Sequence, residues 1–182
     1  MRFQLCGILA LPLLALGEQI VVKNPITQQT MPTLADLLTI EQTTSIFYSY
    51  ARELTSSNVF SDSGASPITL LVPTNKAVMA LSRKPHQGPA PDIVITDEEF
   101  DSKSKENVER WVSAHIIPQS PIAFDQTYPT LLDGKTITFT QSKKGDTDDW
   151  SRAVIEGKVH IIGKREASNG VLFLIDGTIP SD

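Results

Sequence analysis

The feature that most constrains the fold is an apolar run near the C-terminal end of the chain, residues 171–175. Asn169-Gly170 introduces this run, and the dipeptide tolerates positive φ at both positions. Five consecutive apolar residues between two turn signals are typical of a strand that is buried on both faces. We therefore expect this segment to be the central strand of a sheet, covered by layers that the earlier segments supply.

Residues 1–17 have the pattern of a secretory signal peptide, in which Arg2 precedes an apolar stretch and small residues follow at Ala15 and Gly17. The apolar stretch is shorter than the roughly 20 residues that a membrane-spanning helix needs, so we expect no transmembrane segment. The single cysteine, Cys6, leaves with this peptide. We therefore expect a disulfide-free chain in the secretory pathway, either secreted or delivered to a vacuole.

The charge balance excludes some partners. The net charge is −5, and loss of Arg2 with the signal peptide makes it −6, which argues against nucleic acid or an anionic membrane. Residues 18–32 form an extended lead-in, and residues 33–180 suit one domain. No cofactor or metal is expected, because the aspartate-rich stretch at 143–149 lacks the glycine and the terminal glutamate of a calcium loop.

Two short helices are expected at the start of this domain. Thr33 has the position of a helix N-cap, with Asp36 three residues further on. A second helix is expected from about Thr44, because apolar residues that include Phe47 and Tyr50 recur at spacings of three and four. The two helices should form a hairpin that lies on the sheet.

Residues 68–72 predict a strand that Pro73 ends, followed by a short helix over 75–81. Thr74 and Asn75 stand between the two elements and allow two interpretations. They form a polar site at the end of a strand, or they hold the strand-to-helix corner through a side-chain cap. The cap is favoured, because threonine at this position accepts a hydrogen bond from the first turn of a helix.

Residues 82–95 contain three prolines and a glycine and predict an exposed, mobile loop. Loops on a rigid scaffold often carry binding residues. Lys84, His86 and Asp92 are therefore candidates for contact with a partner. We expect His86 to be solvated rather than to bind a metal, because the sequence around it offers no further ligand.

Two helices are expected after this loop, a short acidic one capped by Thr96 and another that begins at Ser104. In the second helix, His115 falls on the same face as Trp111 and two valines. A buried imidazole without hydrogen-bond partners costs about 1–3 kcal/mol. His115 is therefore either a catalytic base or a structural residue that ties the helix end to a neighbouring loop, and the structural role is favoured.

Two hairpin signals follow. A turn at 131–135 leads into the alternating strand 136–140, which should be half-buried. A second hairpin spans 153–162, with Glu156-Gly157 at its turn and His160 on its second strand.

Three of these stretches, in this order and at this spacing, resemble the fasciclin domain family. Residues 70–78 look like its first motif, residues 114–117 like its central Tyr-His segment, and residues 167–176 like its second motif. The resemblance implies an α+β, fasciclin-like fold, a β-sandwich-like wedge flanked by helices, used in extracellular adhesion. It also implies structural motif roles for five residues: Thr74, Asn75, His115, Asn169 and Gly170.

Three positions depart from the family pattern. Ala114 replaces the usual tyrosine, and Phe173 stands where the second motif often has histidine. Lys164-Arg165 occupies the place of an Asp-Ile pair that is linked to integrin contact in animal members. These departures are compatible with the fold and argue against integrin binding.

The sequence favours a non-enzymatic secreted or vacuolar adhesion or interaction module. Its partner would be an extracellular or cell-wall protein or polysaccharide, with weak self-association as a further mode. Two alternatives stay open: a carrier of a small apolar ligand held between helices and sheet, and a hydrolase with His115 as base. The sequence contains no serine-hydrolase elbow, zinc-protease helix motif or phosphate loop.

Overall fold

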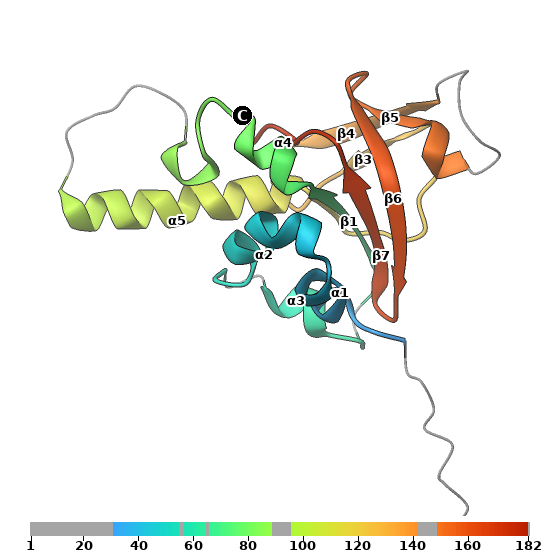
Figure 1. The fold of residues 1–182 in the computed structure, drawn as a ribbon, viewed down its shortest axis with the longest axis horizontal. Coiled ribbons are helices and arrows are strands. Elements are labelled where there is room, and N and C mark those ends of the chain that lie inside the picture. The colour runs from blue at the N-terminus through green and yellow to red at the C-terminus, as the bar shows by residue number, and fades with distance from the viewer. Residues whose placement is uncertain (1–30, 55–56, 65, 89–95, 142–148, 182) are drawn as a thin grey trace, which may run out of the picture.

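The computed structural model describes residues 31–54, 57–64, 66–88, 96–141 and 149–181 (Figure 1). The expected signal peptide lies outside these residues, as do nearly all of the lead-in, Asp92 and most of the aspartate-rich stretch. Within the described part, helices gather toward the N-terminal half and strands toward the C-terminal half. The α+β class expected from the sequence is confirmed.

The described strands form one seven-stranded sheet with the order β2-β1-β7-β6-β5-β4-β3. Their bounds are β1 (Ile68–Pro73), β2 (Ile116–Ile117), β3 (Thr127–Pro129), β4 (Thr136–Gln141), β5 (Ala153–Ile155), β6 (Val159–Ala167) and β7 (Gly170–Ile175). Strand β7 pairs in parallel with β1 and antiparallel with β6. The predicted position of residues 171–175 inside the sheet is confirmed.

Alternate residues of β1 and β7 enter two different hydrophobic clusters. Leu70 and Leu172 face the helices, whereas Leu71 and Phe173 face the opposite side. Because side chains alternate along a strand, a run that is apolar at every position can be buried only between two such layers. The continuous apolar pattern of β7 therefore fits its place in the sheet, and β1 is interrupted by one polar residue, the buried Thr69.

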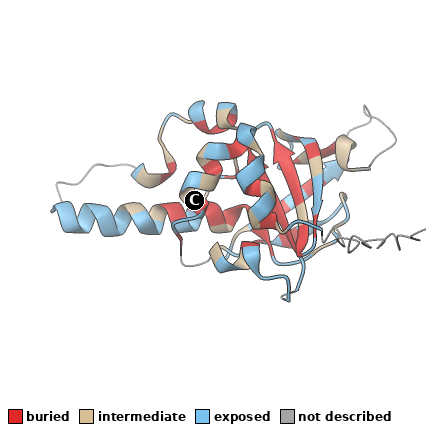
Figure 2. Ribbon diagram, turned by 60° about the horizontal axis from the view of Figure 1, so that its bottom comes forward, coloured by how far each residue is buried: buried red, intermediate tan, exposed pale blue. Residues whose placement is uncertain are grey.

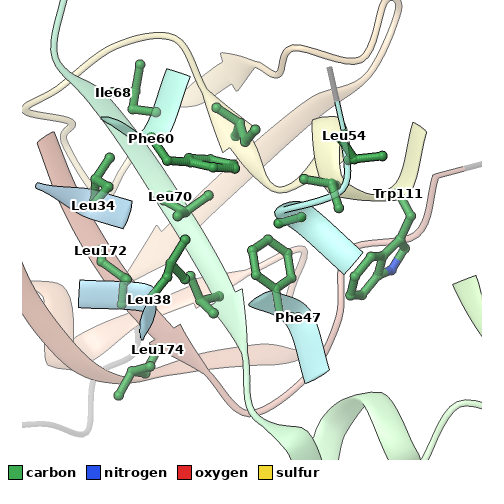
Figure 3. Close-up of a cluster of buried hydrophobic side chains, with 14 of the residues drawn as sticks. Leu34, Leu38, Phe47, Leu54, Phe60, Ile68, Leu70, Trp111, Leu172 and Leu174 are labelled. Atoms are coloured by element: carbon green, nitrogen blue, oxygen red, sulfur yellow. The ribbon is translucent and has the colours of Figure 1, made fainter. Parts of the chain in front are cut away.

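The helices cover one face of the sheet. They are α1 (Leu34–Ile40), η1 (Gln42–Thr44), α2 (Ser45–Ala51), α3 (Asn58–Ser61), α4 (Asn75–Met79), η3 (Pro85–Gln87) and α5 (Asp97–Ala114); η4 (Asp149–Arg152) precedes β5. In Figure 3, Leu34 from α1, Phe47 from α2 and Trp111 from α5 point into the cluster that Leu70 and Leu172 complete. The predicted packing of the first helices on the sheet is confirmed.

The sheet curls until its two edges approach one another. The second cluster combines residues from strands that are far apart in the sheet order: Ile117, Leu71, Phe173, Ile155 and Phe139. Leu131, just beyond β3, donates its N–H to the carbonyl of Ile116 in β2 at 2.9 Å. The wedge expected from the sequence is therefore a nearly closed, barrel-like sheet with a core of its own.

The prediction of two separate helices after the loop is wrong, because α5 is one continuous helix of 18 residues. Thr96 caps it through a capping box with Glu99, as the sequence indicates. Ser104, expected to start a new helix, lies in its interior, flanked by lysines that favour helix continuation. The first turns project from the body and are exposed, and the buried face begins at Val108 (Figure 2).

The expected turn between β6 and β7 also differs in detail. Gly170 has a φ of +152°, but Asn169 is not among the residues with positive φ. A Cβ on Gly170 would clash with the carbonyl oxygen of Ile68, because β1 pairs closely at this point. Glycine is therefore required here for both its conformation and the close approach of the neighbouring strand.

Candidate functional site

Thr74 forms the corner between β1 and α4. Its N–H donates to the carbonyl of Ile175 at the end of β7, at 3.1 Å, and its Oγ1 accepts from the N–H of Ala77 at 3.3 Å. The predicted cap is therefore present, on a helix that ends at Met79 rather than at residue 81. Thr74 joins the carboxyl ends of two parallel strands to the helix that follows.

Asn75 fixes this corner to the helical layer. Its Oδ1 accepts from the N–H of Ile46 at 2.9 Å. Its Nδ2 donates to the carbonyl of Gln42 at 3.1 Å and to the Oγ of Ser45 at 3.0 Å. The side-chain amide is thus engaged by the beginning of α2.

Asn169 is a buried connector at the other end of β7. Its Oδ1 accepts from the N–H of Leu34, the first residue of α1, at 2.9 Å. Its Nδ2 donates to the carbonyl of Phe60 in α3 at 2.9 Å. One side chain therefore holds two helices to the turn between β6 and β7.

His115 ends α5 and is fully buried. Its Nδ1 lies 2.7 Å from the carbonyl oxygen of Trp111, and its Nε2 accepts from the N–H of Ile179 at 3.0 Å. Burial lowers the pKa of the imidazole to about 4, while the Trp111 carbonyl opposes this shift. Both ring nitrogens are used by the backbone, so His115 has no nitrogen left to act as a general base.

The first part of the expected contact loop is ordered and anchored, which corrects the prediction of an exposed, mobile segment for residues 82–88. Lys84 donates from Nζ to the carbonyls at the end of α4, including Met79 at 2.9 Å. His86 is half-buried, and its Nδ1 lies 3.1 Å from the hydroxyl of Tyr50. The cause is the fit of η3 against α5, where Asn107 donates to the carbonyl of His86.

A groove of about 830 Å³ lies where β1 and β7 end. Two exposed apolar side chains line it, Met79 of α4 with 62% of its surface exposed and Ile162 of β6 with 53%. Lys76 and Asp176 add one charge of each sign. The groove therefore combines exposed apolar and charged side chains at the carboxyl ends of β1 and β7.

Sequence reasoning missed Met79 and Ile162. The alternation along the hairpin, with Ile161 inward, could have placed Ile162 on the outer face. The register of β6 against β7 shifts between Ile161 and Gly163, so Ile162 lies in a bulge. Its nearness to α4 depends on the fold and has no local signal.

A family model for the fasciclin domain matches residues 42–180, well over half of the chain. The chain belongs to the fasciclin domain family. Among curated relatives, a FAS1 domain-containing protein of Saccharomyces cerevisiae is 27% identical over 169 residues, which cover 81% of this chain and 62% of the relative. One of Aspergillus fumigatus is 29% identical over 147 residues, covering 72% of this chain and 62% of the relative.

This fasciclin chain thus spans about 62% of the length of these relatives. Among solved structures, a FAS1 domain pair from the insect cell adhesion molecule Fasciclin I matches with a TM-score of 0.48 and 15% identity. That match covers 75% of this chain and 45% of the pair. The family assignment depends on the family model and not on this structural match.

The basic pair that replaces the family's Asp-Ile pair is engaged within the fasciclin domain. Lys164 donates from Nζ to Glu166 at 2.8 Å, and Arg165 lies 3.4 Å from the carboxylate of Glu41. No grouping of histidine, cysteine, aspartate and glutamate in the described part of the chain could hold a metal ion. No helix there is long and apolar enough to cross a bilayer.

Proposed function

We propose that this fasciclin domain is a non-enzymatic interaction module that acts in the secretory pathway, outside the cell or in a vacuole. Its partner is a protein that inserts an apolar side chain into the groove between Met79 and Ile162. The signal-like residues 1–17 support the route. The single observation that carries the binding role is that two large apolar side chains remain exposed in one groove.

The charges of the groove favour a protein partner. Lys76 and Asp176 flank the apolar pair, so a partner with an apolar anchor between a basic and an acidic residue would match both signs. Interfaces commonly combine a buried apolar centre with a polar rim. A polysaccharide would be expected to stack on an aromatic ring, and no aromatic residue lines this groove in the described chain.

The contacts of the polar residues in the family motifs support an interaction module, because they argue against the alternative functions. The side chains of Thr74, Asn75, His115 and Asn169 all hydrogen-bond within the domain. A hydrolase that uses His115 lacks an accessible base for the same reason. A carrier would need space between helices and sheet, and buried side chains from both layers lie in that region (Figure 3).

The test is affinity capture from the native extracellular or vacuolar fraction, with residues 18–182 as bait. Captured proteins are compared for wild type, Met79→Ser and Ile162→Ser. Both substitutions remove an apolar anchor, and exposed sites usually change stability by no more than about 0.5 kcal/mol. We expect both variants to lose the same captured protein and to keep the wild-type melting temperature.

Ile40→Ser is the matched control, because Ile40 is 71% exposed and does not line the groove. Capture that survives in both groove variants contradicts this placement, and loss with His86→Ala instead would return the contact to the loop that holds Lys84, His86 and Asp92. Capture of polysaccharide alone would contradict the protein partner. Sedimentation of the bait alone reveals whether the partner is a second copy.

A further inference from the structure

The segment after β7, residues 177–181, crosses the end of α5 as an irregular strap. The N–H of Ile179 donates to Nε2 of His115 at 3.0 Å, and the carbonyl of Ser181 accepts from Nη2 of Arg110 at 3.1 Å. The side chain of Ile179 is fully buried. The strap forms no helix or strand, and it is attached by these two hydrogen bonds and by the packing of Ile179 in the second hydrophobic cluster.

The strap requires a neutral imidazole. The carbonyl of Trp111 can only accept, so Nδ1 of His115 must carry the hydrogen that is donated to it. The N–H of Ile179 can only donate, so Nε2 must be unprotonated. A proton on Nε2 would set two donors against each other inside the core, and the bond that holds the strap would be lost.

In the described part of the chain, no acidic side chain contributes to the His115 pKa, so none would stabilise a protonated ring. Phe47 and Trp111 pack against it, with ring centroids at 5.6 and 4.6 Å. Tyr50 packs against Trp111 and lies beside His86. Arg83 and Lys84 line the groove next to the strap, and Arg110 binds the strap. The His160–Asp176 pair stands at the start of the strap, whereas Glu109 on α5 and Arg52 after α2 are exposed. Burial lowers the pKa of His115, and the hydrogen bond to the Trp111 carbonyl opposes this shift.

We propose that His115 makes the strap an acid-released latch, in which protonation of Nε2 detaches residues 177–181 from α5 while the sheet stays folded. The strap forms one wall of a groove of about 470 Å³, lined also by Trp111 and Pro85. Trp111 is only 4% exposed with the strap in place. Release therefore removes one wall of this groove beside Trp111, independently of the Met79–Ile162 groove.

The difference in His115 pKa between the closed and open forms sets how strongly strap opening depends on pH. The closed form holds the His115 pKa at about 4, whereas an opened, hydrated ring returns toward about 6.5. The equilibrium constant for opening then rises about 30-fold between about pH 8 and about pH 5, because the open form binds the proton more tightly.

The experiment is hydrogen–deuterium exchange by mass spectrometry on residues 18–182, with protection factors corrected for the intrinsic pH dependence of exchange. We expect the protection of the peptide that contains Ile179 to fall about 30-fold over this pH range, while the peptide of β7 stays protected. Unchanged protection of the strap overturns the proposal. Equal protection of the two peptides at every pH also overturns it, because the strap would then open only when the domain unfolds as a whole.

Two variants identify the responsible group. His115→Gln offers Ile179 an acceptor that does not titrate and should remove the pH response, whereas His160→Gln should keep it. The reverse pattern assigns the effect to the His160–Asp176 pair and overturns the proposal. Wild type alone gives a second test by NMR: the ring nitrogens of His115 and the amide of Ile179 must titrate with one midpoint, and separate midpoints overturn the latch.

Discussion

The most direct test of how this fold is held together is the replacement of Asn169 by alanine. Asn169 is 3% exposed, and its amide joins Leu34 in α1 and Phe60 in α3 to the β6–β7 turn. Both partner residues are buried, Leu34 completely and Phe60 to within 3%. Water therefore cannot easily replace the lost amide.

The magnitude follows from the two groups that lose their partner. The N–H of Leu34 is one of the first N–H groups of α1, which no helical carbonyl can satisfy. A buried donor or acceptor left without a partner costs about 1–3 kcal/mol, so the two together cost about 2–6 kcal/mol. That is a large fraction of the roughly 5–15 kcal/mol by which a domain is stable.

Urea unfolding followed by tryptophan fluorescence measures this loss as a lower midpoint at unchanged slope. Asn58→Ala is the control, because Asn58 is exposed on α3 and should lose less than about 0.5 kcal/mol. A loss below about 1 kcal/mol for Asn169→Ala, with the fold intact, would refute the reasoning about orphaned groups.

Asn169→Asp separates the two bonds. The carboxylate can still accept from Leu34, but it cannot donate to the carbonyl of Phe60. Burial should raise the pKa of this aspartate above its unfolded value of about 3.9. Its stability deficit should therefore grow as pH rises through these values, whereas that of Asn169→Ala should not.

Two further predictions concern His115 and Gly170. The pKa of His115 is about 4 in the folded protein and about 6.5 in the unfolded chain. Its contribution to folding stability is therefore present above about pH 6.5 and is lost as pH falls to about 4. Across this range, wild type should lose about 3 kcal/mol relative to His115→Gln in urea unfolding. Gly170→Ala should cost about 3 kcal/mol or more, because its Cβ would clash with a neighbouring carbonyl, whereas Gly134→Ala, in open space at φ +75°, should cost about 1 kcal/mol in the same assay.

The parts of the fold that could be predicted have local causes. The run at 171–175 required two covering layers because it is apolar at every position, and β7 has both. Thr33, Thr74 and Thr96 were identifiable as caps because a cap depends on residues within one turn. For His115 the sequence left two roles, a catalytic base or a structural residue. Its helical spacing predicts burial but does not identify its hydrogen-bond partner.

The parts that could not be predicted depend on contacts between distant segments. The partner of His115 is Ile179, 64 residues away, and the partners of Asn169 are more than 100 residues away. The short strands β2 and β3 exist because β1 and β4 supply neighbours for them. The loop at 82–88 looks irregular in sequence, yet α5 gives it a surface to pack on.

The residues that hold the fold together also limit which positions can determine partner specificity. The residues that carry the family resemblance, such as Thr74, His115 and Asn169, use their polar atoms to hold strands and helices together. A group that is fully used inside the domain can fix the fold but cannot distinguish one partner from another. Under the proposed function, partner specificity would therefore lie at exposed positions outside the motifs, such as Met79 and Ile162. Membership of the family, shared with relatives that are 27–29% identical, therefore does not identify the partner of this chain, because a fold does not by itself determine function.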